Sequence, residues 1–257
     1  MANEERFNVM KIAIAGKNQC AVDVHKYFKN NYPKHELIGI PNSDDDVNDG
    51  WQPSFKKYLL KNYYGVGSLE DCYNEEDLLF FSVEFDKIIK TENFKSKKLF
   101  NLHFSLLPKY RGCHTNFIQL YNGEKYSGVT LHEIDNSIDG GPIISQMKFK
   151  IRRNHTAQEN YVRLMNTAVK LFKCKIEDII DNNYKSTPQD DKLAGKYYDR
   201  KSVDYKTIKS MVVEPYDLET HNKLRALIFP AFQYPIVNGK EVKRSLYKNG
   251  KFICEYV

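Results

Sequence analysis

The chain has 257 residues, of which 28% are charged and 41% hydrophobic, with a formal net charge of +6. This length fits one large domain, or one domain with a small appendage, and 15 Phe with 18 Tyr exclude a disordered chain because they supply too much apolar area to leave in water. No run of about 18 apolar residues occurs, so no membrane span is expected.

Residues 1–8 and the cysteines indicate the cellular compartment in which the protein is expected. Residues 1–8 are charged and lack an apolar stretch, so no secretory signal is expected. The five Cys residues are odd in number and form no CxxC pair, which argues against a disulfide framework or a zinc ribbon and for a reducing cytoplasm. The mild basic excess permits an anionic partner, from a phosphorylated metabolite to RNA, without selecting one.

The first half of the chain has the pattern of an α/β layer. Residues 9–16 and 36–41 are apolar runs typical of buried parallel strands, and residues 20–31 between them have helical spacing. Gly16 alone stands at the first turn, so the GxGxxG fingerprint of dinucleotide binding is absent. Ser54 is a good N-cap for a further helix. Additional strands are expected at 78–83, 98–102, 127–134 and 142–151, with a turn and a short helix over 84–96.

A long helix is predicted at residues 157–180. Thr156 followed by Glu159 forms the capping box that starts it. The chain becomes polar after residue 182, and we therefore divide it into a catalytic domain, 1–182, and a C-terminal region, 183–257.

The C-terminal region is expected to hold helices at 206–212 and 216–227, and short β pieces around Ile236 and at 247–256. Asn249-Gly250 is a strong hairpin-turn signal within the second piece. The predicted fold is α/β: a Rossmann-like, mostly parallel sheet with helices on both faces, plus a small C-terminal helix and β-hairpin region.

The segment from residue 100 to 112 carries the polar groups of greatest chemical interest. Asn101 and His103 are two apart at the end of a strand, so both point to one face, at the edge where parallel sheets bind ligands. Gly112 then allows a close backbone approach. Farther along, Asp139 followed by two glycines is a carboxylate on a tight turn.

Together these residues resemble the folate-dependent formyltransferase family. N-x-H-x-S-L-L-P starting at Asn101, a glycine four residues beyond the proline, and D-G-G starting at Asp139 carry the resemblance, which covers roughly residues 10–180. The family includes glycinamide ribonucleotide, methionyl-tRNA and nucleotide-sugar formyltransferases. The resemblance implies that Asn101, His103 and Asp139 are catalytic, that N10-formyltetrahydrofolate is the formyl donor, and that no metal takes part.

The three side chains suit this chemistry. Formyl transfer to an amine passes through a tetrahedral oxyanion, to which Asn101 can donate a hydrogen bond. His103 can exchange protons near neutral pH, and Asp139 can orient its ring. The amine is itself the nucleophile, so we expect direct transfer without an acyl-enzyme. Cys113 is then incidental, and His114 and His132 are expected in packing or surface roles.

The resemblance also implies which residues surround the folate. The loop after the strand at 78–83 and the D-G-G turn would frame the pterin, largely through backbone groups. The candidates are Phe81, Ser82, Val83, Phe85, Ile138 and Gly140. Ordinary packing is the alternative for the two phenylalanines.

Three segments are similar to the nucleotide-sugar N-formyltransferases: residues 51–54, 82–89 and 225–235. Aromatics of the last segment could stack on a thymine base, and its arginine could pair with a pyrophosphate; core packing and a surface ion pair are the alternatives. The candidate substrate contacts are Trp51, Ser105, Lys109, Tyr110, Arg225, Phe232 and Tyr234.

The resulting hypothesis is formylation of dTDP-4-amino-4,6-dideoxyglucose for O-antigen (lipopolysaccharide) or other surface polysaccharide. Three alternatives stay open: a dTDP-3-amino-3,6-dideoxyhexose substrate, a methionyl-tRNA formyltransferase-like enzyme, and a non-catalytic nucleotide-binding protein. The 75 residues after 182 are fewer than the tRNA-binding barrel of the tRNA enzymes, which disfavours the second. We expect a cytoplasmic homodimer, joined through the C-terminal hairpin, that binds neither nucleic acid nor membrane.

Overall fold

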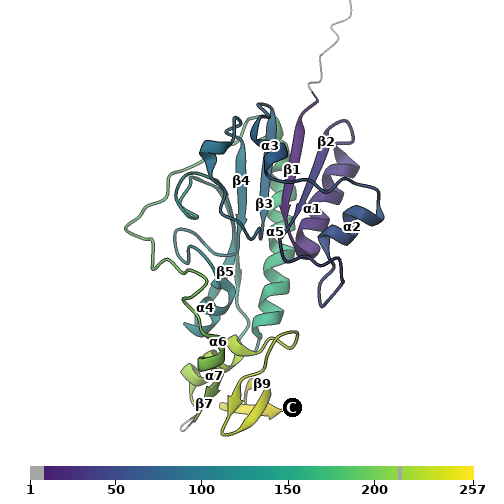
Figure 1. Cartoon of the computed structure of the whole chain (residues 1–257). Helices are drawn as coiled ribbons and strands as arrows, with labels where there is room; N and C mark the ends of the chain where they lie inside the picture. The colour runs from purple at the N-terminus through teal and green to yellow at the C-terminus, as the bar shows by residue number, and fades with distance from the viewer. Residues whose placement is uncertain (1–8, 214–215) are drawn as a thin grey trace, which may run out of the picture.

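The computed structural model describes residues 9–213 and 216–257, and its centre is a six-stranded sheet of order β2-β1-β3-β4-β5-β6 (Figure 1). The strands are β1 Lys11–Gly16, β2 Glu36–Pro41, β3 Leu78–Val83, β4 Leu99–His103, β5 Tyr126–Glu133 and β6 Ile143–Lys150. The first four are parallel and the last two antiparallel. The predicted α/β fold with a mostly parallel sheet is therefore confirmed.

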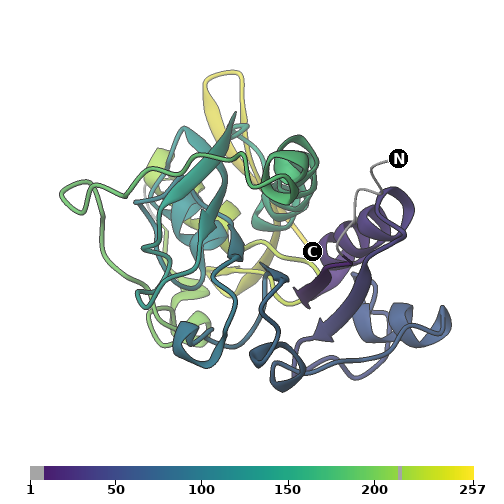
Figure 2. The ribbon, with the colours of Figure 1, turned by 90° about the horizontal axis from the view of Figure 1, so that it is seen from above.

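The alternation of side chains along β1 decides which layer each face meets. Ile12 and Ile14 pack against helices α1 (Asn18–Asn31), α2 (Phe55–Lys61) and α5 (Ala157–Ile180). Ala13 and Ala15 point to the other face, which is covered by short α3 (Glu70–Tyr73) and by a loop that contains the 3-10 turn η1 (Thr91–Asn93). Seen from above, α1 and α5 lie on the same side of the sheet (Figure 2).

The best-capped helices begin where the sequence predicts. The Ser54 hydroxyl accepts a hydrogen bond from the Lys57 backbone N–H, 2.8 Å away, at the start of α2. Thr156 and Glu159 form the reciprocal capping box of α5, whose bounds match the prediction. Capping contacts span three residues, so they can be recognised without the rest of the fold.

The C-terminal region is partly different from the prediction. Residues 206–212 are not one helix: α6 (Tyr205–Ile208) is a single turn capped by Asp204, and β7 (Ser210–Met211) follows it. This strand pairs with β8 (Ile236–Val237), a partner distant in sequence, and that pairing outweighs helical propensity. The remaining elements are α4 (Thr115–Tyr121), which the sequence analysis did not identify, α7 (Leu218–Leu227), β9 (Lys240–Lys248) and β10 (Lys251–Tyr256).

The predicted hairpin turn is confirmed. Asn249 and Gly250 join β9 to β10 with φ of 51° and 79°, the left-handed values that a two-residue hairpin turn requires. Strands β7 to β10 form a second sheet at one end of the molecule, beside α7, which packs on α4 (Figure 1).

Some predictions are not decided by the fold. Residues 1–8, on which the expected lack of a secretory signal depends, lie outside the described residues. The domain boundary at residue 182 stays a prediction. Within residues 9–213 and 216–257, no helix has the length and apolar character needed to cross a membrane.

Candidate active site

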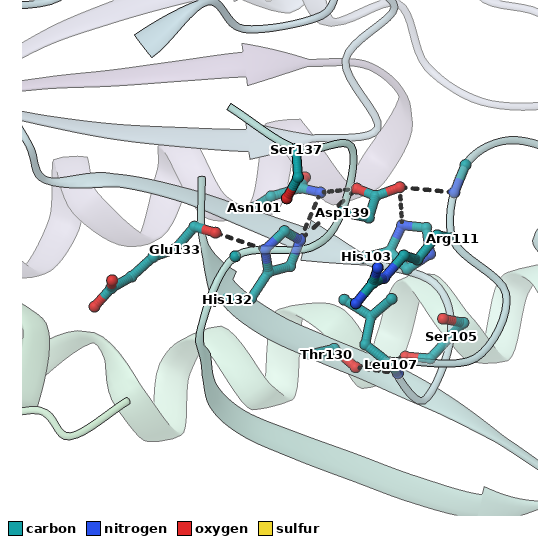
Figure 3. A network of polar contacts seen from close by, with 12 residues as sticks. Asn101, His103, Ser105, Leu107, Arg111, Thr130, His132, Glu133, Ser137 and Asp139 are labelled. Carbon is teal, nitrogen blue, oxygen red and sulfur yellow. Dashed lines mark hydrogen bonds and ion pairs between the residues drawn. The ribbon is translucent and has the colours of Figure 1, made fainter. Parts of the chain in front are cut away.

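The proposed catalytic side chains meet at the end of β4, as expected. Asn101 and His103 are on β4, and a turn after β5 returns Asp139 to them (Figure 3). The Asn101 amide donates to Asp139 Oδ1 over 3.1 Å, and His103 Nδ1 lies 3.5 Å from Asp139 Oδ2. The Gly112 backbone N–H also donates to Oδ2, over 2.8 Å. The Asp139 carboxylate thus contacts Asn101, His103 and Gly112, all of which belong to the sequence motif.

His103 is buried between two acceptors. Its side chain is 8% exposed, with Nδ1 facing Asp139 and Nε2 lying 2.8 Å from the carbonyl oxygen of Tyr110. Each ring nitrogen can therefore donate when the ring carries two protons. The arrangement suits a group that takes up a proton and passes it on.

His132, for which the sequence predicted a packing or surface role, lies beside the proposed trio. It is 2% exposed, and Nδ1 donates over 2.7 Å to the Glu133 carbonyl. Burial lowers the pKa of His132 to about 4, and the neutral ring then offers Nε2 as an acceptor for the Asn101 amide, 3.1 Å away. The antiparallel register sets Asn101 opposite His132, so the strand pairing was the signal that could have found it.

A cleft of about 1620 Å³ opens above these residues. Its lining includes the loop after β3 and the turn after β5, with Phe85, Ile134 and Ile138. The lining also includes an aromatic box, by which we mean Trp51, Tyr161, Phe229 and Phe232.

The rings of the aromatic box are in mutual contact. The ring centre of Trp51 lies 5.4 Å from Tyr161, 5.0 Å from Phe229 and 6.1 Å from Phe232. Phe232 is 72% exposed, so much of its ring is free to meet a ligand. Trp51 and Phe232 were candidates from the sequence, whereas Tyr161 and Phe229 were not.

The structure brings only part of the predicted site together. Residues that line the cleft as expected are Trp51, Ser82, Phe85, Asn101, His103, Ile138, Asp139 and Phe232. Residues that do not line it are Phe81, Val83, Ser105, Lys109, Tyr110, Gly140, Arg225 and Tyr234.

The residues outside the cleft have structural partners instead. Phe81 and Val83 have fully buried side chains in the core beneath the sheet, because alternation points them away from Ser82. Ser105 is buried and donates to the Lys109 carbonyl over 2.8 Å.

The remaining outside residues pack nearer the C-terminal region. The Tyr110 hydroxyl donates to Glu124 over 2.7 Å, and Tyr234 packs in the small core around α7. Arg225 is 4% exposed and donates to Asn222 and to the Arg152 carbonyl, and burial lowers its pKa to about 10. The expected pairing of this arginine with a pyrophosphate in the cleft is therefore not supported by its position.

Comparison with known proteins agrees with this geometry. Residues 75–176 match the Formyl transferase family model. One similar structure is that of WlaRD, described as a sugar 3N-formyl transferase in the presence of dTDP and 5-N-formyl-THF. The two sequences are 41% identical, the match covers 94% of this chain and 88% of the WlaRD chain, and the TM-score is 0.87. An N-formyltransferase from Helicobacter canadensis, in complex with folinic acid and dTDP-3-aminofucose, is 40% identical, with coverage of 94% and 89% and a TM-score of 0.87.

Curated relatives match over shorter lengths. A methionyl-tRNA formyltransferase of Staphylococcus epidermidis is 30% identical over 202 residues, which are 74% of this chain and 64% of that protein. The bifunctional polymyxin resistance protein ArnA of Wigglesworthia glossinidia brevipalpis is 36% identical over 124 residues, 48% of this chain and 19% of that protein. The chain thus spans about a fifth to two thirds of the length of these two relatives. On the strength of the sugar-enzyme matches, the chain belongs to the formyltransferase family, in the group of nucleotide-sugar N-formyltransferases.

Proposed function

We propose that the protein transfers the formyl group of N10-formyltetrahydrofolate to the 3-amine of a dTDP-linked 3-amino-3,6-dideoxyhexose. The observation that carries the proposal is the position of the Asn101, His103 and Asp139 side chains at one strand end, in a cleft lined by the aromatic box and by the loops after β3 and β5. Two relatives at 40–41% identity are described with dTDP and a 3-amino sugar or 3N activity.

The 4-amino sugar expected from the sequence becomes the second candidate. A 4-N formyltransferase from Francisella tularensis shares the fold, with a TM-score of 0.73 but only 18% identity. The choice between amine positions therefore depends on the more similar relatives, which favour the 3-amine. Use of the product in surface polysaccharide, a cytoplasmic location and a homodimer stay predictions.

Three side chains would carry the reaction. The deprotonated amine attacks the formyl carbon, the new C–N bond forms, and the carbonyl oxygen becomes an oxyanion that accepts a hydrogen bond from Asn101. His103 takes the proton from the amine and gives it to N10 of the folate as the bond to N10 breaks. Asp139 holds the ring of His103 and stabilises its protonated form.

Both N–H groups of the Asn101 amide are engaged in the structure, by Asp139 and by His132. Donation to the oxyanion therefore requires the contact with Asp139 to be exchanged for the ligand, while His132 keeps the amide oriented. His103 likewise exchanges the Tyr110 carbonyl for the reacting groups. Catalytic hydrogen bonds commonly form their final geometry only with substrate bound.

Two sets of residues that line the cleft, the aromatic box and the loops after β3 and β5, suit the two ligands. The aromatic box can stack on thymine, a contact worth about 1–3 kcal/mol per base in single-strand sites. Lys17, which lines the cleft just before the N-terminus of α1, replaces Arg225 as the cation for the pyrophosphate. The loop after β3 and the turn that contains Ile138 would hold the pterin.

A substrate panel tests the proposal. The protein is incubated with N10-formyltetrahydrofolate and with dTDP-linked 3-amino or 4-amino sugars, while the folate absorbance is followed. We expect rapid formylation of a 3-amino sugar and slow or no formylation of the 4-amino isomers. Preferred turnover of a 4-amino sugar would establish the second candidate, and turnover of charged initiator tRNA alone would refute both.

A further inference from the structure

The cleft holds a carboxylate that the catalytic trio does not use. Glu84 follows the last residue of β3 and lines the cleft. Val83 pairs with Leu102 in the parallel register, and Glu84 and His103 are the residues that directly follow the two members of this pair. The φ of Glu84, 59°, is in the left-handed region, and the Asn42 side chain donates to the Glu84 carbonyl oxygen over 3.1 Å.

Two donors hold the Glu84 carboxylate in place. Oε2 accepts a hydrogen bond from the Tyr161 hydroxyl and lies 3.5 Å from the Asn18 amide nitrogen, which also donates to that hydroxyl over 2.8 Å. Tyr161 belongs to α5 and to the aromatic box, and Asn18 begins α1. Glu84 thus joins the loop after β3 to the aromatic box.

Both contacts reach Oε2, and among residues 9–213 and 216–257 neither contact engages Oε1, which can accept a hydrogen bond from a ligand in the cleft. A carboxylate oxygen is a strong acceptor for the hydroxyl groups of a hexose. If the base occupies the aromatic box and the amine lies at His103, the hexose passes Glu84. Burial raises the pKa of Glu84 while Lys17 opposes this, which is consistent with a desolvated acceptor.

The geometry points to Glu84 as a specificity-determining residue that accepts a hydrogen bond from a hexose hydroxyl next to the reacting amine. This inference rests on the proposed function, because it assumes a nucleotide sugar in the cleft. It assigns to Glu84 the recognition of the sugar ring, and to Tyr161 the positioning of Glu84.

Binding measurements test the inference without depending on turnover. Calorimetry compares dTDP with the dTDP-linked 3-amino sugar, for wild type, Glu84→Gln and Tyr161→Phe. Asp71→Asn is the matched control, since Asp71 is an exposed carboxylate outside the cleft lining whose contacts are with Ser68. We expect Glu84→Gln to weaken sugar-nucleotide binding by about tenfold to a hundredfold, as for hydrogen bonds to charged groups, with dTDP affinity unchanged. Tyr161→Phe should give a smaller loss and Asp71→Asn none.

Analogues lacking the hydroxyl on either carbon next to the amine identify the partner atom. With the correct deoxy analogue, Glu84→Gln should cause no further loss, the coupling that a double-mutant cycle measures. Equal losses for dTDP and for the sugar nucleotide, or a fall in thermal stability that accounts for them, would overturn the inference, as would normal sugar binding by Glu84→Gln. If wild type binds the sugar nucleotide through Glu84 but formylates no sugar, only the proposed function fails.

Discussion

Asp139 organises the site at the scale of single residues. It adopts φ of 52°, a left-handed value, and its two oxygens contact Asn101, His103 and the Gly112 backbone. A Cβ on Gly141 would lie 2.0 Å from the Glu133 carbonyl oxygen, so the chain after Asp139 needs glycine to return to β5. Backbone geometry thus explains why the second residue after Asp139, in the D-G-G sequence, is glycine.

Replacing His103 separates proton transfer from binding. His103→Asn keeps a side chain of comparable polarity but cannot exchange a proton, so we expect kcat to fall by about 10²–10⁴-fold. The affinity for dTDP should change little. Folate absorbance and dTDP titration measure the two effects, with His35→Asn, outside the cleft, as control. Retained kcat in His103→Asn would contradict the assigned role.

The buried residue His25 makes the free energy of unfolding depend on pH. His25 is fully buried beside Tyr58, and burial lowers its pKa from 6.5 to about 4. The unfolded chain binds this proton more readily, so stability is complete above pH 6.5 and falls between 6.5 and 4, by up to about 3 kcal/mol from this pKa shift.

His25→Gln removes this titration. Urea unfolding at several pH values should show a weaker loss of unfolding free energy from pH 6.5 to 4 than in wild type, with His132 supplying part of the remaining dependence. An unchanged pH profile would mean that His25 does not govern acid stability.

At the scale of elements, a polar segment after α5 holds the turn that carries Asp139. We call residues 183–205 the strap. Gln189 donates to the carbonyls of Asp139 and Gly141, each over 2.8 Å, and the Cys113 backbone N–H donates to Tyr198 over 2.6 Å. The strap therefore fixes the turn that carries Asp139, although its polar composition resembles that of a linker.

Gly112→Ala tests this coupling. Gly112 has φ of +94°, and an added Cβ would lie 2.0 Å from the Tyr198 carbonyl oxygen. We expect a loss of more than about 1 kcal/mol in stability, faster proteolysis of the strap and a lower kcat. Gly65→Ala is the control, since no atom of the described part of the chain lies within 4 Å of its added Cβ. Normal kcat with a loosened strap would show that Asp139 does not need it.

At the scale of the whole molecule, the two predicted regions share one cleft. Trp51 follows β2, Tyr161 is on α5, and Phe229 and Phe232 follow α7, so the aromatic box exists only when the C-terminal region packs against the sheet domain. The net charge of +6 is compatible with an anionic nucleotide sugar, but the residues at the cleft, not the total, select it.

The single tryptophan of the chain reports on this cleft directly. We expect dTDP to change the fluorescence of Trp51, and Phe232→Ala to weaken dTDP binding by about 1–3 kcal/mol, the contribution of one stacked base. Tyr63→Ala, at a side chain 97% exposed, should leave the affinity unchanged. Unaltered dTDP binding by Phe232→Ala would place the base elsewhere.

Features encoded in short segments could be predicted from the sequence alone. The buried strands follow from apolar runs, α5 from its capping box, and the β9–β10 turn from Asn249-Gly250, because each depends on residues within a few positions of one another. Asn101, His103 and Asp139 could be proposed from the sequence because their motif resembles that of the formyltransferase family, and their catalytic role stays a prediction.

Only the tertiary structure decided which side chains join the site and which leave it. Strand register brings His132 to Asn101, and helix packing brings Tyr161 to Glu84, although neither pair is close in sequence. The same packing buries Arg225 away from the cleft. The physical reason is that the position of a side chain depends on which distant strands pair with its own strand and which helices pack on it. A local sequence pattern does not contain this information.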